Sequence, residues 1–332
     1  MAAYTTIKVE PIGYAVINDY DREYDMDIDR KVNIKVNMKG EEYSLITNYK
    51  DDVHLRHSLN RLTQKTYGFD FEQWYQQGYW TDRYRPYSFL HNNEIVANIS
   101  VNPIDFLVNG ELHHTVQIGT VMTDMAYRHR GLSKALMNLV LEQYENTCEL
   151  FYLYANNTVL DFYPKFGFTT ADEYVYIRQF KESSRKLPFR KIDMNYETDK
   201  AMIARLVNRA KPVSQYAMVH NPQLIMFYLT SFMAGDIYYF EDQDLAAVAA
   251  WREDELILMD LFCEKGFDLE QVINSLMKLP KCKVVLGFTP MERTSYTGTS
   301  YTAEFLQEEG STFFVKGKNF LDKGRFSILS HA

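Results

Sequence analysis

Apolar positions between residues 112 and 168 predict a strand, a helix and a second strand in turn. An apolar run that ends at Val121-Met122-Thr123 is typical of a buried strand. After a polar turn, apolar residues recur at the spacing of one helical face, at Leu132, Ala135, Leu136, Leu139 and Val140. A second short apolar run, residues 150–155, predicts the next strand. This strand–helix–strand unit organises the chain.

Alternation of apolar and polar residues from Met26 to Met38, broken only at Arg30, predicts a strand with one exposed face. An earlier run, residues 7–17, would pair with it as a hairpin. Three aspartates in residues 25–29 have the spacing of a calcium loop, but Arg30 stands where that loop needs glycine and Val36 where it needs glutamate. We therefore interpret them as a solvated strand face. The apolar face must pack on the second domain or on another subunit, and the second alternative would make the protein a homo-oligomer.

The first half of the chain continues with helices and then a set of strands. Asp52 is expected to cap a helix with an apolar face, and a second helical piece is expected at residues 69–77. Asn109-Gly110 predicts a hairpin turn. The expected strands are residues 43–49, 87–90, 95–102 and 112–123.

The second half begins after a polar stretch at residues 181–185, which we interpret as a linker. Helices are expected at about 202–210, from Asn221-Pro222, at 269–277 and near 303–307, and strands at 237–240, 245–251, 256–262, 284–288 and 313–315. This order repeats that of the first half, which predicts a diverged internal copy. The expected domains are an N-terminal hairpin extension at 1–40, a first domain at 41–182 and a second at 183–332, all in an α/β (α+β) architecture.

Composition and charge narrow the classes of function. The 332 residues are 46% hydrophobic and 24% charged, so the chain can bury real cores. Its net charge of −8 argues against nucleic acid as a partner and mildly favours cationic substrates such as amines. The sequence contains no C-x-x-C pair, so it does not indicate a metal site. Without an apolar run near 18 residues or a signal-peptide core, we expect no membrane association and a cytoplasmic location.

The turn between the first strand and the helix has the features of an anion site. The first N–H groups of a helix lack intrahelical partners, and the helix dipole adds partial positive charge there. Gly131 lets the backbone approach a ligand, while Arg128 and Arg130 supply donors suited to phosphate. A diphosphate would fit this turn. An ordinary helix start with a glycine turn is the alternative.

Two motifs in this order resemble the GNAT superfamily of acyl-CoA-dependent N-acyltransferases. The first is Arg128 to Ser133, similar to Gln/Arg-x-x-Gly-x-Gly/Ala after a strand, and the second combines Asn156 with Phe162-Tyr163 and Gly167-Phe168. The resemblance covers residues from about 41 to 180. It implies a mixed central sheet with splayed strands flanked by helices, here in two tandem copies. Ser133 departs from the small Gly or Ala of the family, which would alter contact with the pyrophosphate a little.

The resemblance also implies residue roles toward acetyl-CoA as co-substrate. Its pantetheine arm would lie between the splayed strands, the turn would hold the pyrophosphate, and Asn156 would bond the arm. The implied cofactor-binding residues are Val121, Met122, Thr123, Arg128, His129, Arg130, Gly131, Leu132, Ser133, Lys134 and Asn156. Tyr163 would donate a proton to the departing thiolate; the alternative is a core aromatic.

The general base is left open. Some family members place a carboxylate on the strand that leads into the phosphate turn, and Gln117 stands roughly there. Glutamine cannot accept a proton at neutral pH. His113, His114 and Asp124 are further candidates, each better explained as a surface residue. A water relay is as plausible.

The second half has lost this chemistry. Cys263 stands where the first half has Arg128, three residues before Gly266, and Leu306 stands where it has Tyr163. The chain therefore resembles a tandem GNAT protein with a degenerate second domain, and loosely the Eis-type acetyltransferases of aminoglycosides and polyamines. Those carry a further sterol-carrier-like domain, which we do not expect in 332 residues, so we do not carry their substrate over.

These observations predict an N-acetyltransferase acting on a primary amine of a small molecule or peptide. A non-catalytic acyl-CoA-binding sensor is the alternative, which Gln117 favours and Tyr163 disfavours. A third interpretation makes the second domain a module that presents a protein amine to the first.

Overall fold

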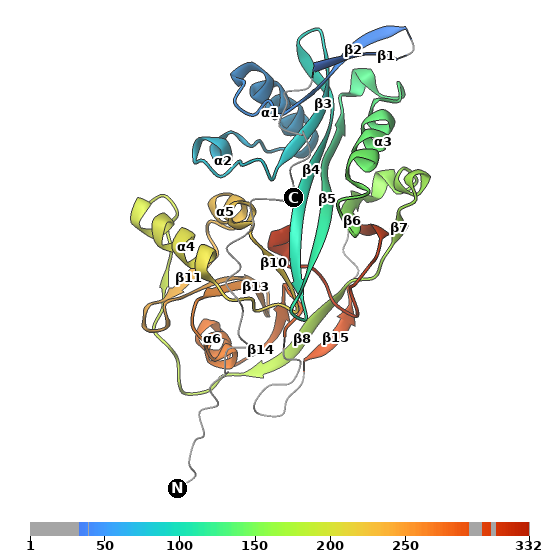
Figure 1. Cartoon of the computed structure of the whole chain (residues 1–332). Helices are drawn as coiled ribbons and strands as arrows, with labels where there is room; N and C mark the ends of the chain where they lie inside the picture. The colour runs from blue at the N-terminus through green and yellow to red at the C-terminus, as the bar shows by residue number, and fades with distance from the viewer. Residues whose placement is uncertain (1–32, 39, 292–300, 307–309, 332) are drawn as a thin grey trace.

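The computed structural model describes residues 33–38, 40–291, 301–306 and 310–331 (Figure 1). These residues form a mixed α/β fold with two mixed sheets, consistent with two tandem copies. The expected hairpin partner at 7–17 and the calcium-like aspartates lie outside the described residues. The described end of the alternating segment is strand β1 (Asn33–Met38), which pairs antiparallel with β2 (Glu41–Thr47).

The first sheet carries the strands of the first half of the chain. Its order is β1, β2, β3 (Arg85–His91), β4 (Glu94–Val108), β5 (Glu111–Thr123), β6 (Leu150–Asn156), β16 (Ser311–Gly317) and β7 (Thr169–Thr170), with β10 (Tyr216–Val219) paired to β4. Among these strands, β5 and β6 form the parallel pair. The predicted hairpin turn at Asn109-Gly110 is confirmed, and both residues have the positive φ that a tight turn requires.

The second sheet has the order β15 (Thr302–Phe305), β8 (Tyr174–Lys181), β14 (Lys281–Leu286), β13 (Glu255–Cys263), β12 (Leu245–Arg252), β11 (Ile237–Phe240) and β9 (Arg190–Lys191). The helix expected near 303–307 is wrong, because Thr302–Phe305 is a strand that pairs with β8. A run this short fits the helical period as well as the strand period, so pairing with the open edge of β8 decides its conformation.

The two halves of the chain exchange a strand. β8 follows β7 in the sequence, yet it pairs with β14 and β15 of the second sheet. β16 comes from the end of the chain, yet it lies between β6 and β7 of the first sheet. Each half therefore completes the sheet of the other, and the two sheets are joined through their backbones. The domain boundary expected after residue 182 stays a prediction.

Six helices lie against these sheets within the described residues: α1 (Val53–Tyr67), α2 (Glu72–Gln76), α3 (Leu132–Tyr144), α4 (Glu197–Arg209), α5 (Pro222–Thr230) and α6 (Leu269–Leu276). Asp52 caps α1 as expected, accepting a bond from the Leu55 N–H at 3.2 Å. Pro222 occupies the first position of α5, where its missing N–H costs nothing.

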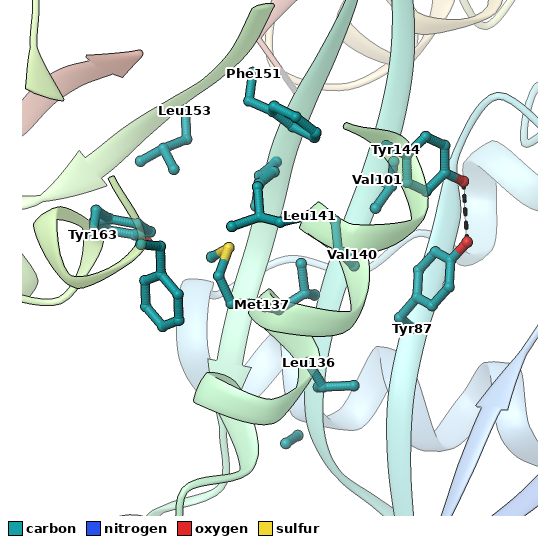
Figure 2. Packing of buried hydrophobic residues seen from close by; sticks show 14 of the residues in the cluster. Tyr87, Val101, Leu136, Met137, Val140, Leu141, Tyr144, Phe151, Leu153 and Tyr163 are labelled. Carbon is teal, nitrogen blue, oxygen red and sulfur yellow. Dashed lines mark hydrogen bonds between the residues drawn. The ribbon is translucent and has the colours of Figure 1, made fainter. Parts of the chain in front are cut away.

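Helix α3 is fixed to the first sheet by its apolar face (Figure 2). Leu136, Met137 and Val140 are fully buried in the core that β4 and β5 also enter. Each such side chain contributes roughly 1.5–3 kcal/mol on burial. At the C-terminal end of α3, the Tyr144 and Tyr87 hydroxyls are hydrogen-bonded at 3.0 Å. This packing holds the N-terminus of α3 at the end of β5.

Candidate active site

A wedge opens in the first sheet where β5 and β6 separate. The two strands pair only from Thr115 to Gln117, the last pair being Gln117 with Tyr152. Beyond it, β5 contains a bulge, because β4 advances two residues while β5 advances three, and Thr120 adopts a φ of 39°. We call the space between residues 118–123 of β5 and 153–156 of β6 the wedge. It exposes the backbone of β5 to a ligand.

The phosphate loop, residues 128–134, joins the wedge to α3. Gly131 is the N-cap of α3 with a φ of 89°, and it has no side chain to satisfy the first N–H groups. The first turn of α3 contains no acidic residue. Arg128, His129 and Lys134 bring cationic or donor groups to the same cavity. Free N–H groups at a helix N-terminus, with basic side chains beside them, suit a phosphate group.

The loop borders a cavity of about 850 Å³, which we call the cofactor cavity. Its lining includes most of the sequence-predicted cofactor residues: Val121, Thr123, Arg128, His129, Gly131, Leu132, Ser133 and Lys134. Met122 instead points into the core and is 2% exposed. Arg130 pairs with Glu41 and donates to the Ala126 carbonyl oxygen at 3.0 Å. Asn156 borders a neighbouring cavity and accepts a bond from the Thr158 N–H at 2.9 Å.

Ser133, the departure from the family motif, has a structural use. Its hydroxyl lies 2.6 Å from the hydroxyl of Thr123, which ties the start of α3 to the end of β5. Gly or Ala at this position could not form that bond.

A second cavity of about 360 Å³, which we call the acceptor cavity, lies on the other side of the wedge. Val121, Val159 and Tyr163 line both cavities. Tyr163 begins the 3-10 helix Tyr163–Phe166 and is 5% exposed. Burial raises the pKa of its phenol, so the hydroxyl is protonated at neutral pH. A proton donor therefore stands where the two cavities meet.

The second half of the chain supplies part of the acceptor cavity. Phe227 and Phe232 reach it from α5 and its C-terminal turn, and His331 reaches it from the end of the chain. The C-terminal segment is held there because Tyr152 donates to the Ser330 carbonyl oxygen at 3.1 Å and Tyr228 donates to that of His331. Sequence reasoning missed these residues, since no local pattern links them to the phosphate loop. The 3-10 helix Ile328–Ser330, which precedes His331, contacts α5.

The other candidates for the general base are engaged outside both cavities. His113 lies 3.2 Å from Glu149, and His114 lies 2.8 Å from Asp105. Asp124 caps a short 3-10 helix through the Ala126 N–H. None of the three lines the described walls of either cavity.

The sequence of residues 54–171 matches the family model described as an acetyltransferase (GNAT) domain. The family match confirms the resemblance carried by the phosphate loop and by the Tyr163 segment. No curated protein matches the chain.

The chain is similar to several solved structures. A probable N-acyltransferase from Enterococcus faecalis V583 has a TM-score of 0.53 at 12% identity, covering 79% of this chain and 69% of its own. A GCN5-related N-acetyltransferase from Kribbella flavida has a TM-score of 0.49 at 18% identity, and the match covers 79% of this chain and 68% of that one. Eis1 from Mycobacterium abscessus has a TM-score of 0.49 at 14% identity, and the match covers 77% of this chain and 69% of that one. At such identities the first likeness concerns the fold alone.

No helix among the described residues combines the length and apolar character needed to cross a bilayer.

Proposed function

We propose that the protein transfers an acetyl group from acetyl-CoA to a primary amine of a small molecule or peptide. The observation that carries this proposal is the meeting of two cavities at Tyr163, one beside the phosphate loop and one beside the wedge. A thioester held in the first cavity and an amine held in the second would face each other there. Positioning of this kind supplies much of the rate enhancement in bimolecular transfer.

The phosphate loop fits a diphosphate group. The uncapped N–H groups of α3 would bind phosphate oxygens, with Arg128 and Lys134 neutralising charge. Val121 and Thr123 would offer backbone groups to the pantetheine arm, together with the Asn156 side chain. His129, Leu132 and Ser133 would shape the wall. Arg130 and Met122 would act indirectly, through their contacts with Glu41 and with the core.

Tyr163 would donate a proton to the thiolate sulfur as the C–S bond breaks. Its raised pKa keeps the proton in place until a strong base, the departing thiolate, is within reach. The amine must also lose a proton. No carboxylate occupies the Gln117 position, and we propose that this proton leaves through water in the acceptor cavity.

The test is release of free thiol from acetyl-CoA with a panel of amines. Time-dependent release that requires both the amine and the protein supports the proposal. Tight acetyl-CoA binding with no release for any amine would instead support a non-catalytic acyl-CoA sensor. Gln117 is the residue that favours this second function, since it replaces a proton acceptor by a neutral amide.

A further inference from the structure

The acceptor cavity has an unusual wall, and the argument here rests on the proposed acyl transfer. Its described lining is dominated by aromatic side chains from α2 and the loop before it and from α5 and the turn after it, among them Phe69, Phe71, Trp74, Phe227, Tyr228 and Phe232. Several of these rings pack edge to face, for example Phe69 with Phe232 at a centroid distance of 5.4 Å. Such a wall binds an apolar or aromatic body through burial of its surface.

Two polar atoms in this wall have no hydrogen-bond partner within the described residues. They are Oε1 of Gln117 and Nε2 of His331, and both residues line the cavity. The Gln117 side chain is 1% exposed at the base of the wedge. An unsatisfied buried acceptor costs about 1–3 kcal/mol, which a ligand N–H would recover.

The His331 ring is held in a fixed position. It stacks on Tyr154 at a centroid distance of 3.7 Å, and the Tyr228 hydroxyl holds its backbone carbonyl oxygen. Burial, with a further contribution from the Arg325 charge, lowers the pKa of His331, so the ring is neutral. A neutral imidazole with its proton on Nδ1 presents a lone pair at Nε2.

We propose that the acceptor is a primary amine on an aromatic or compact apolar body that carries no second positive charge. The amine would donate N–H bonds to Gln117 and His331, and the body would lie against the Phe71 and Phe227 rings. None of the described lining residues is acidic. A second ammonium group in this cavity would therefore find no carboxylate among the described lining residues, and burial of a charge without a counter-charge is costly. The aromatic faces can still attract the one reacting ammonium group.

Calorimetry separates this inference from the proposed function. The protein saturated with CoA, which cannot transfer an acyl group, is titrated with 2-phenylethylamine and, separately, with spermidine. We expect 2-phenylethylamine to bind at least tenfold more tightly. Equal or tighter binding of spermidine, or no binding of 2-phenylethylamine, would overturn the inference. Binding of 2-phenylethylamine without thiol release from acetyl-CoA would instead leave the inference standing and remove the acetyltransferase.

Two variants locate the binding. Phe232→Ser removes a ring at the mouth of the cavity, where the side chain is 58% exposed, and should weaken 2-phenylethylamine binding about tenfold. Phe305→Ser on β15 is the matched control, with a ring 57% exposed on the second sheet, and should bind as the wild type does. His331→Phe keeps the ring stacked on Tyr154 but loses Nε2, and should also bind about tenfold more weakly. Wild-type affinity in both cavity variants, with unchanged thermal melting, would contradict the assignment of this cavity.

Discussion

The N-termini of α3 and α6 show how one architecture can keep or lose an anion site. Both helices follow a strand that runs beside a parallel partner, β5 in the first sheet and β13 in the second. Helix α3 begins at Gly131 with no side-chain cap and no acid in its first turn. Helix α6 begins after Asp268, which accepts bonds from the Glu270 and Gln271 N–H groups, and Glu270 adds negative charge. The first terminus is open to phosphate, while the second is already satisfied by its own carboxylate.

The two sheets also differ at the place where their parallel strands separate. Beyond the last β5–β6 pair the first sheet opens into cavities. Beyond the last β13–β14 pair, Gly287 lies directly on Met259 and donates to the Leu258 carbonyl oxygen at 2.8 Å. The C-terminal segment then packs there, with Leu329 fully buried in the core that contains Met259. The second half therefore keeps the strand arrangement, but Gly287 and the C-terminal segment close the gap between β13 and β14, and residues of this half contribute to the wall of the acceptor cavity.

The largest expected effect is on turnover. Tyr163→Phe keeps the ring and its packing but loses the hydroxyl, so acetyl-CoA affinity should change little. With an amine substrate in hand, kcat should fall by roughly 10²–10⁴, the usual weight of a general acid. That corresponds to about 2.7–5.4 kcal/mol. Tyr301→Phe, in a buried tyrosine of the second half, is the matched control and should leave kcat unchanged. Equal kcat for Tyr163→Phe and wild type would remove this residue from the mechanism.

Gly131→Val should weaken acetyl-CoA binding. A β-carbon at Gly131 would meet only the Met38 Cε at 3.7 Å, so the cause would be the φ of 89° that valine resists. Strain of about 1–3 kcal/mol predicts a loss of roughly 5- to 150-fold in affinity. Gly266→Val in the second half has open space and an ordinary φ, and should bind acetyl-CoA as the wild type does. Calorimetry measures both, and equal affinities would contradict the role of this loop.

Asp268→Ala tests the capped helix. Loss of the two bonds to α6 should lower the free energy of unfolding by about 0.5–2 kcal/mol. Acetyl-CoA affinity should not change, because α3, and not α6, is the helix that we propose binds phosphate. Urea denaturation and calorimetry together check this expectation. An affinity that falls with Asp268→Ala would mean that the second half takes part in cofactor binding.

The effect expected at Asp260 is on stability alone, and its size depends on pH. Burial raises the pKa of this carboxyl to about 6, although the Leu261 N–H and the Ser327 hydroxyl oppose the shift. The folded state thus binds more protons than the unfolded state between about pH 4 and 6, and stability falls as pH rises through that range. Asp260→Asn should remove this fall, so its gain in melting temperature appears above pH 6 and vanishes near pH 4. A gain of the same size at both pH values would point to another cause.

Local signals predicted most of the helices and turns of this protein. The Asp52 cap, the Asn109-Gly110 turn and the face of α3 follow from neighbouring residues, so the sequence was sufficient there. The exchange of β8 and β16 was not predictable, because it is a choice between strand partners far apart in the chain. The helix expected near 303–307 is wrong for that reason.

The candidate site likewise has one part that the sequence predicts and one part that it does not. The phosphate loop is a contiguous motif and could be found from the sequence. Phe227, Phe232 and His331 join it only because the second half of the chain packs over the wedge. Their chemical types are common in any core, so composition and spacing alone could not separate them from packing residues.

Calorimetric titration of the wild-type protein with acetyl-CoA tests the central claim most directly, namely that the first half alone holds the cofactor. The uncapped α3 and the open wedge predict one site per chain, whose heat is lost or strongly weakened in Gly131→Val and unchanged in Gly266→Val. Two equivalent sites per chain, or one site that survives Gly131→Val at full affinity, would contradict the account.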